Sequence, residues 1–304
     1  MDLSQLQAFL AVAHERSFSG AAQKLHRTQP AISQNIRKLE DELGEKLLDR
    51  SSRDGVLTDA GQVLLEYAEK LLNLRAETTR ALSELRQLQT GKLSLAANEF
   101  TSVYLLQVLD KFRRLHPLVR IAVQRSYASR IPRQVLSHEV ELGVISFRPE
   151  EPDLRSIVVY RDELVFVVPP QHPFAEQGTV NIRDLGTQSF VAHNVPSPYR
   201  AKVLEAFRRH KTSLNMPVEL PTIEAIKRFV AMGNGVALVP GICVEKEIER
   251  GELAEIRVRQ LRLERKLRVI YRKKSQLSHA GGAFLQAVES LCRNGGRYLY
   301  ELDR

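Results

Sequence analysis

The sequence has 304 residues, of which 43% are hydrophobic and 27% are charged, and its formal net charge is +9. This composition is that of a soluble globular protein, and the length predicts two or three domains. No apolar run approaches the roughly 18 residues of a membrane span. Residues 1–20 lack the basic start and continuous apolar run of a signal peptide. We therefore expect a cytoplasmic protein with no membrane partner.

The chain has two cysteines, Cys243 and Cys292, which lie far apart in the sequence. Neither belongs to a CxxC or Cys/His spacing, so the pattern predicts no metal site and no disulfide framework. We expect both to be buried thiols of the core. No motif calls for a cofactor.

The positive charge is unevenly distributed. Residues 1–90 contain 12 Lys/Arg and 13 Asp/Glu, whereas residues 91–304 contain 33 and 23. A nucleic-acid interpretation of the N-terminal part therefore cannot rest on its bulk charge and depends on pattern.

Apolar residues at helical spacing predict a first helix that runs from Leu3 to about Arg16. Ser19 is a candidate N-cap for a short second helix. That helix presents the small residues Ala21 and Ala22, which let two helices approach closely.

A third helix is predicted after Thr28, its candidate N-cap, with Pro30 in the first turn and a stop at Gly44. Its apolar stripe is expected to be buried. The stripe consists of Ile32, Ile36, Leu39 and Leu43.

The opposite face of this helix carries Gln29, Ser33, Gln34 and Arg37. Amides pair bidentately with adenine, Arg with guanine, and Ser with a base or a phosphate, so the set suits a DNA major groove. An ordinary solvated helix face is the alternative.

Residues 46–61 predict a β-hairpin with an Asp54-Gly55 turn. Arg50 and Arg53 are placed to touch phosphate or the minor groove. Three helices and this hairpin make a winged helix-turn-helix.

Phe9 and the run SFSGAAQKLHRTQPAISQNIRKLEDELGEKLLDRSSRDGVLTDAG resemble the N-terminal signature of the LysR-type transcriptional regulators over residues 1–65 without a gap. The resemblance implies that the recognition helix begins at TQPAIS and that Thr28, Gln29, Pro30, Ser33 and Arg37 contact DNA. Two positions depart from the family pattern in the wing. Leu48 stands where an aromatic residue is usual, and Asp54 stands where glycine or a basic residue is common.

Thr58 is a candidate cap for a helix that has no Gly or Pro from Gln62 to Thr90, about 45 Å in length. A four-three alternation, interrupted by Arg75, predicts the seam of a helix pair. The alternative is packing against the helix's own domain. The seam consists of Leu64, Ala68, Leu71, Thr78, Leu82 and Leu85.

Dimerisation is favoured because a winged helix that reads an interrupted palindromic operator in double-stranded DNA needs two copies at fixed separation. The family resemblance implies homodimers that commonly pair into homotetramers.

From Lys92 onward, short apolar strands alternate with helical stretches. The succession resembles the two-lobed, periplasmic-binding-protein-like α/β effector domain of the same family. We expect a DNA-binding domain at 1–58, a linker helix at 59–90 and an effector domain at 91–304. Its lobe I is expected at about 91–162 and 267–304, and its lobe II at about 163–266.

Ligands of such domains bind in the cleft between lobes, where strand ends and helix N-termini meet. Hydroxyls, an aromatic ring and an Arg there suggest a small anionic metabolite, although Glu99 at the mouth weakens a purely anionic interpretation. For each Ser or Thr, a simple helix cap is the alternative. The candidates are Thr101, Ser102, Tyr127, Ser129, Phe147, Arg148, His193, Asn194 and Thr222.

Residues 257–274 hold nine Lys/Arg and one Glu. A second nucleic-acid surface is one interpretation. We favour the solvated edge of a half-exposed strand, because Leu and Val alternate with the charges.

The sequence has none of the hydrolase, metalloprotease or nucleotide-binding motifs GxSxG, HExxH, GxxxxGKS and GxGxxG, so an enzyme is not indicated. A transport receptor would suit the two lobes but not the winged helix. We therefore predict a transcriptional regulator in which a small effector changes DNA bending or access of RNA polymerase. A ligand-independent architectural DNA-binding protein is the alternative.

Overall fold

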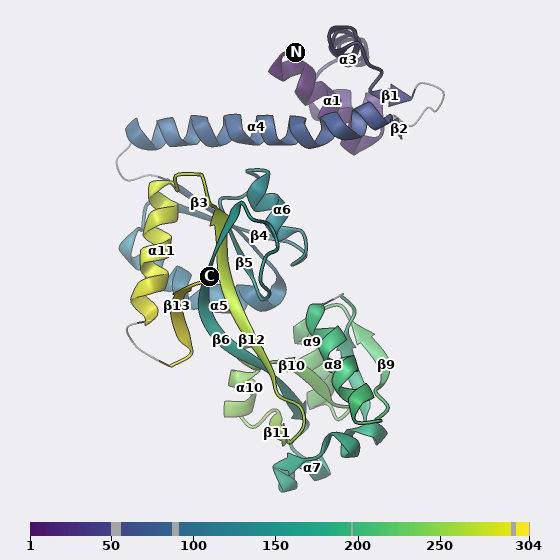
Figure 1. The fold of residues 1–304 in the computed structure, drawn as a ribbon, viewed down its shortest axis with the longest axis vertical. Helices are drawn as coiled ribbons and strands as arrows, with labels where there is room; N and C mark the ends of the chain where they lie inside the picture. The colour runs from purple at the N-terminus through teal and green to yellow at the C-terminus, as the bar shows by residue number, and fades with distance from the viewer. Residues whose placement is uncertain (50–55, 87–90, 196, 293–295, 304) are drawn as a thin grey trace. The chain divides into compact units, whose positions relative to one another are not determined.

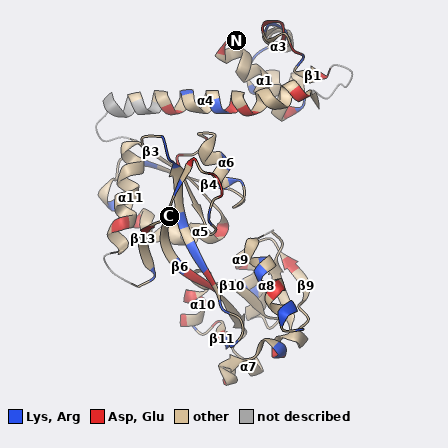
Figure 2. Ribbon diagram, viewed as in Figure 1, with Lys and Arg blue, Asp and Glu red and all other residues tan. Residues whose placement is uncertain are grey.

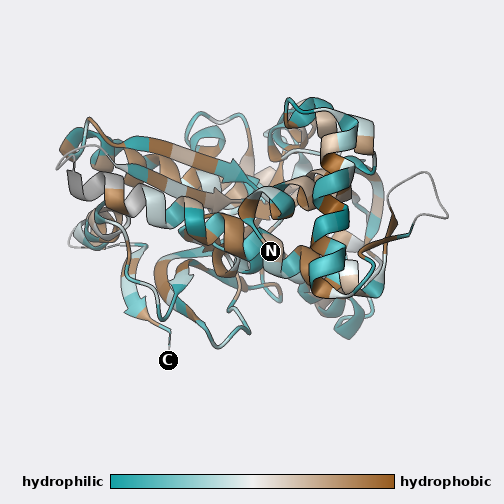
Figure 3. Cartoon of the chain, turned by 90° about the horizontal axis from the view of Figure 1, so that it is seen from above, coloured by the Kyte–Doolittle hydropathy of each residue, from teal (hydrophilic) through white to brown (hydrophobic). Residues whose placement is uncertain are grey.

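The computed structural model describes residues 1–49, 56–86, 91–195, 197–292 and 296–303. The chain divides into two compact units, Met1–Leu88 with Ser137–Glu139, and Gln89–Leu136 with Val140–Arg304. The helices of both units mix hydrophobic and hydrophilic residues (Figure 3), and none in the described ranges has the length and apolar character to cross a bilayer.

The first unit is a winged helix followed by a long helix (Figure 1). A small core of Ala8, Val12, Ala21, Ile32 and Ile36 joins the first three helices. The elements are α1 (Leu3–Glu15), α2 (Phe18–Lys24), α3 (Gln29–Leu43), the antiparallel pair β1 (Leu48–Asp49) and β2 (Val56–Leu57), and α4 (Asp59–Arg86).

Two local expectations in this unit were wrong. The cap of α2 is Ser17, whose hydroxyl accepts a hydrogen bond from Gly20 N at 3.1 Å, and Ser19 lies inside the helix. Leu43 is 40% exposed. The buried stripe instead ends with Leu39 and Glu40, whose carboxylate accepts from Leu47 N at 3.0 Å and so fixes the entry to the wing.

The helix α4 begins at Asp59, as expected, with the Thr58 hydroxyl accepting from Gly61 N at 3.0 Å. A side chain at Gly61 would clash with the Leu47 carbonyl oxygen, so glycine permits the close approach of α4 to the wing. Leu64 and Ala68 pack against Leu6, Phe9 and Leu39 of the winged helix. The start of the predicted seam therefore packs on its own domain. The Leu85 side chain lies outside the described residues.

The second unit is built on a mixed sheet with the order β4-β3-β5-β12-β6-β11-β7, and β10 and β13 also pair with β6. Its strands are β3 (Lys92–Ala97), β4 (Arg120–Arg125), β5 (Leu142–Ile145), β6 (Leu154–Val168), β7 (Thr179–Val180), β10 (Ala237–Pro240), β11 (Ala254–Val258), β12 (Leu263–Arg272) and β13 (Tyr298–Leu302). A separate parallel pair joins β8 (Ser189–His193) and β9 (Asn215–Leu220).

The helices divide between two cores. Lobe I holds α5 (Glu99–Leu115), α6 (Ile131–Leu136) and α11 (His279–Cys292) with β3, β4, β5 and β13. Lobe II holds α7 (Pro173–Gln177), η1 (Ile182–Thr187), α8 (Pro198–Arg209), α9 (Ile223–Ala231), η2 (Gly241–Cys243) and α10 (Glu245–Glu249) with β7 to β11. Only the long strands β6 and β12 run through both lobes (Figure 1), within the described part of the chain. They form the crossing between the lobes.

The basic run 257–274 is only partly solvated. It includes β12, which lies between β5 and β6 in the interior of the sheet, and Figure 2 shows its basic residues along that inner strand. Arg265, Arg268 and Arg272 are each less than a tenth exposed. The other six basic residues of the run are exposed. The expectation was therefore wrong for these three arginines, because alternation along one strand does not show whether neighbouring strands cover it.

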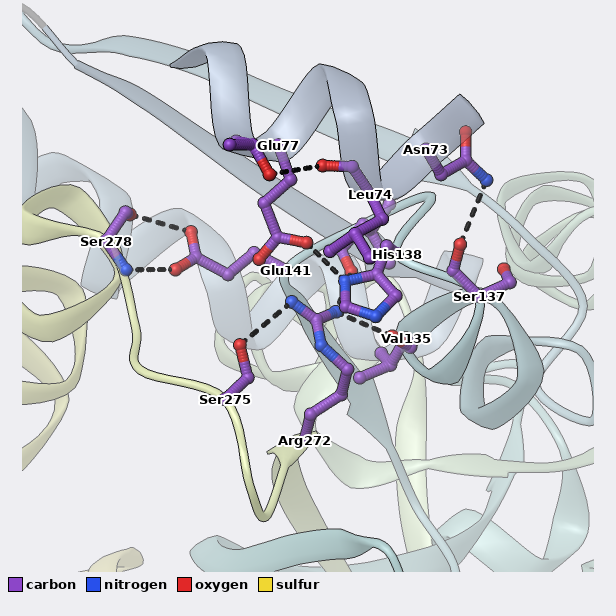
Figure 4. A network of polar contacts seen from close by, with 12 residues as sticks. Asn73, Leu74, Glu77, Val135, Ser137, His138, Glu141, Arg272, Ser275 and Ser278 are labelled. Carbon is purple, nitrogen blue, oxygen red and sulfur yellow. Dashed lines mark hydrogen bonds and ion pairs between the residues drawn. The ribbon is translucent and has the colours of Figure 1, made fainter. Parts of the chain in front are cut away.

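Each of these buried arginines has acceptors. Arg272 donates to the carbonyl oxygens of Val135 (2.7 Å) and Val140 (3.3 Å), while Glu141 of the same region accepts from Ser278 N (Figure 4). Arg268 Nε donates to Asp303 Oδ2 at 2.7 Å, which ties the C-terminal strand to the sheet.

We predict that Asp303→Ala lowers stability by about 1–3 kcal/mol, because it leaves the buried Arg268 guanidinium without its carboxylate. Thermal or urea unfolding measures this. Glu301→Ala is the matched control, since the Glu301–Arg161 pair is exposed on both sides and its loss should change stability by under about 0.5 kcal/mol. Equal effects of the two substitutions would refute a special role for Asp303.

Candidate functional site

The helix α3 holds the predicted DNA-reading residues on its outer side. Gln29, Gln34 and Arg37 are exposed, as are Thr28 and Pro30, and Ser33 is half-buried. The opposite side is fixed by the fully buried Ile32, Ile36 and Leu39. Thr28 occupies the N-cap position in extended conformation without a side-chain cap bond, so its hydroxyl is not used within the helix. Gly44 ends the helix at φ 71°. The predicted wing contacts Arg50 and Arg53 lie outside the described residues.

The second candidate site lies where β6 and β12 cross between the lobes. Asp162 of β6 and Arg265 of β12 stand directly opposite each other in the strand register. Arg265 Nη1 lies 2.8 Å from Asp162 Oδ2, and both side chains are almost fully buried. Burial raises the pKa of the Asp162 carboxyl, although Arg265 and the Ile242 N–H oppose this shift.

The Arg265 guanidinium lies against aromatic rings of both lobes. Its Cζ is 5.9 Å from the ring centre of Phe100 in α5 and 5.0 Å from that of Tyr199 in α8. The Tyr199 hydroxyl donates to the carbonyl oxygen of Ser146 in lobe I at 2.7 Å. The buried Nε of Arg265 makes no hydrogen bond to any described residue. A desolvated N–H donor is therefore left for another acceptor.

Glu99 and His193 form a second polar contact between the lobes. Glu99 Oε1 accepts from Ile223 N at 2.8 Å. Glu99 Oε2 and His193 Nε2 face each other at 3.5 Å, and neither atom has a hydrogen-bond partner in the described part of the chain. The His193 ring also packs edge-on against Phe100, with centres 5.1 Å apart. Phe100 thus contacts both His193 and Arg265.

Among the predicted effector residues, His193 belongs to this interlobe cluster, and Thr222 adjoins Ile223, which Glu99 contacts. Several hydroxyls have structural partners. Thr101 is fully buried and donates to Val144 O at 3.1 Å, Ser102 donates to Asn98 O at 2.7 Å, and Thr222 accepts from Ala225 N at 3.2 Å. Thr222 is therefore the N-cap of α9, as in the alternative interpretation, whereas Asn98 is the N-cap of α5 and Thr101 and Ser102 lie within that helix.

The remaining predicted effector residues have other surroundings. Tyr127 is exposed and its ring is covered by Arg130, with Cζ 5.6 Å from the ring centre. Phe147 packs against a lobe I core cluster. Ser129, Arg148 and Asn194 are exposed.

Sequence reasoning missed Phe100, Asp162, Tyr199 and Arg265. A signal was present for two of them, because Asp162 and Arg265 are charged residues inside the strand-forming runs YRDELVFVV and LERKLRVIYR. A charge within a buried strand requires a partner. The pairing of these two residues, however, joins segments about a hundred positions apart in the sequence.

Two family models cover most of the chain. Residues 3–62 match the bacterial regulatory helix-turn-helix protein of the lysR family, and residues 86–293 match the LysR substrate binding domain. The chain belongs to the LysR family. The resemblance predicted from the N-terminal signature is confirmed, as is the fold class of a winged helix joined to a two-lobed α/β domain.

Individual proteins agree with this assignment. A probable RuBisCO transcriptional regulator of Cyanidioschyzon merolae is 35% identical and covers 94% of this chain and 97% of its own. The crystal structure of CbnR, a LysR family transcriptional regulator, superposes with a TM-score of 0.72 at 22% identity, over 95% of this chain and 99% of CbnR. The Synechocystis PCC6803 CcmR regulatory domain in complex with 2-PG has a TM-score of 0.62 at 25% identity, over 68% of this chain and 99% of that one.

This LysR-family protein is thus a DNA-binding transcriptional regulator with an effector-binding domain, and not an enzyme. Its two cysteines are free. Cys243 is buried as expected, whereas Cys292 is half-buried and so is not a core thiol. Burial raises the pKa of the Cys243 thiol to about 12 and also raises that of Cys292.

We predict that Cys243 of the native regulator does not react with iodoacetamide at about pH 8, because almost none of a buried thiol with so high a pKa is thiolate. Mass spectrometry of labelled peptides before and after denaturation measures this. Cys292 serves as the internal comparison and should label first. Labelling of native Cys243 at the rate of a free thiol would contradict the burial seen here.

Proposed function

We propose that this regulator binds an interrupted palindromic operator through α3 and the wing, and that a small anionic metabolite bound between the lobes of its effector domain changes that binding. The observation that carries the effector proposal is the buried, unpartnered Nε of Arg265 at the lobe crossing. An unpaired buried donor costs about 1–3 kcal/mol, which an acceptor on a ligand recovers.

The anionic class of the effector is supported by charge. Residues 91–304 carry an excess of Lys/Arg, 33 against 23 Asp/Glu, and Arg265 is a fixed cation beside the rings of Phe100 and Tyr199. The CcmR regulatory domain, a structural neighbour, was solved with 2-PG. The predicted residues Thr101, Ser102, Tyr127, Ser129, Phe147, Arg148, His193, Asn194 and Thr222 remain candidates, and Arg265, Phe100 and Tyr199 join them.

The proposed mechanism uses the lobe crossing. The lobes are joined by two strands and by few polar contacts, among them Tyr199 with Ser146 and Glu99 with Ile223. A ligand that satisfies Arg265 binds one lobe arrangement better than another and shifts the equilibrium by that difference alone. Rearranged lobes then alter the placement of the winged helices and with it DNA bending or access of RNA polymerase.

We propose a homodimer that pairs into a homotetramer and acts in the cytoplasm. The support is the apolar surface that α4 leaves uncovered beyond its contact with the winged helix. Val63, Tyr67, Leu71, Leu74 and Leu82 are each more than 40% exposed. Water-exposed apolar side chains in such number along one helix favour a partner helix.

For DNA recognition, Arg37→Ala is expected to lose discrimination at one base pair by about 1–3 kcal/mol, because an Arg reads guanine bidentately. Selection from a randomised duplex library, followed by titration of the selected sites, measures this. Lys38→Ala removes an exposed charge from the next position and is the control, with any weakening expected to be uniform. Uniform weakening by Arg37→Ala would make that residue a phosphate contact.

For the effector, we expect a screen of the full chain against small carboxylates and phosphorylated metabolites to find ligands that raise the melting temperature. Arg265→Lys keeps a positive charge beside Asp162 but removes Nε, so it should weaken such a ligand about tenfold, the equivalent of one charge-assisted hydrogen bond. Arg268→Lys, the same substitution on the same strand, is the control. A ligand that leaves the DNA footprint unchanged would favour the ligand-independent alternative.

A further inference from the structure

The carboxylate of Glu99 lies at the N-terminus of a helix that is not its own. Glu99 is the first residue of α5 in lobe I, and its Oε1 accepts from the N–H of Ile223, the first residue of α9 in lobe II, at 2.8 Å. The carboxylate therefore lies where a helix N-terminus offers a free donor and a favourable dipole to an anion.

Two further donors in the first turn of α9 are bonded within the chain. Ala225 N donates to the Thr222 hydroxyl at 3.2 Å, and Ile226 N donates to the Thr222 carbonyl oxygen at the same distance. With Ile223 N bonded to Glu99, the first N–H of the helix is not available to a ligand's carboxylate or phosphate.

The second carboxylate oxygen of Glu99, unlike Oε1, is not hydrogen-bonded to any described residue. Oε2 is buried, faces His193 Nε2 at 3.5 Å and lacks a hydrogen-bond partner among the described residues. His193 Nδ1 lies 3.2 Å from Val195 N, which can donate only if Nδ1 is unprotonated, so the ring proton is on Nε2. A carboxylate oxygen accepts hydrogen bonds only. The His193 Nε2–H faces this oxygen but, at 3.5 Å, makes no hydrogen bond with it, so Oε2 can accept from a further donor.

We propose that Glu99 is a specificity-determining residue of the interlobe effector site: it closes the N-terminus of α9 to the effector's anionic group and accepts a hydrogen bond from a donor on the effector. The proposal rests on the proposed effector site. The effector is then an anion that also bears a hydroxyl or ammonium group. Its donor faces Glu99, and its negative group lies away from α9 and toward Arg265.

The test uses orthophosphate as the probe and the full-length chain. Glu99→Ala empties the terminus of α9, so phosphate should bind the variant about tenfold more tightly than the wild-type chain, as one charge-assisted hydrogen bond provides. Glu99→Gln keeps an oxygen that accepts from Ile223 N while removing the charge, and should gain little. Apparent dissociation constants come from thermal shift against phosphate concentration, at constant ionic strength.

Glu224→Ala is the matched control for charge. Glu224 is the second residue of α9, is about half exposed and pairs with Lys227 and Arg228, so its loss removes one negative charge from the same helix turn without freeing Ile223 N. Phosphate affinity of this variant should remain near that of the wild-type chain.

Equal phosphate affinity of Glu99→Ala and the wild-type chain overturns the proposal. An equal gain in Glu224→Ala or Glu99→Gln also overturns it, because charge rather than occupancy would then explain the effect. If Glu99→Ala does not fold, Glu99→Ser carries the same expectation, since serine is too short to reach Ile223. None of these outcomes depends on Arg265→Lys, so failure here leaves the effector proposal to its own test.

Discussion

The ion pair between Asp162 and Arg265 is the contact on which the effector domain depends, because it lies on the two strands that join the lobes. A buried pair of this kind is costly to desolvate, and an apolar pair of similar size is often at least as stable. The pair instead contributes to the positions of the two strands and of the Arg265 guanidinium. It fixes the register of β6 against β12 and holds a guanidinium between Phe100 of lobe I and Tyr199 of lobe II.

The polar atoms around this pair support the effector site that we propose there. Arg265 Nε, Glu99 Oε2 and His193 Nε2 are buried without hydrogen-bond partners in the described residues, in a protein where most buried polar groups are satisfied. Such atoms are more stable when hydrated or bound. A change in the separation of the lobes, or an effector between them, that satisfies these atoms lowers the free energy of that lobe arrangement. The equilibrium between arrangements then shifts by this difference.

The winged helix follows another physical rule. Its elements are short, and each is set by residues within a few positions: Ser17 and Pro30 at helix starts, Gly44 at a helix end, and small alanines where helices cross. The exposed face of α3, which we propose reads DNA, is what remains after Ile32, Ile36 and Leu39 are buried. Sequence periodicity alone was sufficient to predict that face, apart from the end of the stripe at Leu43.

The sequence by itself determined the family, the winged helix, the α/β alternation and the outer residues of α3, because these follow from local periodicity, caps and a gap-free signature. It did not determine the interlobe site. Arg265 looked like part of a solvated basic strand, and Thr101, Ser102 and Thr222 looked like ligand groups, although their hydroxyls are bonded within the chain. Whether a strand is covered, and which carboxylate lies at which helix end, depends on segments far apart in the sequence. Only the tertiary structure brought Asp162 to Arg265 and Glu99 to Ile223.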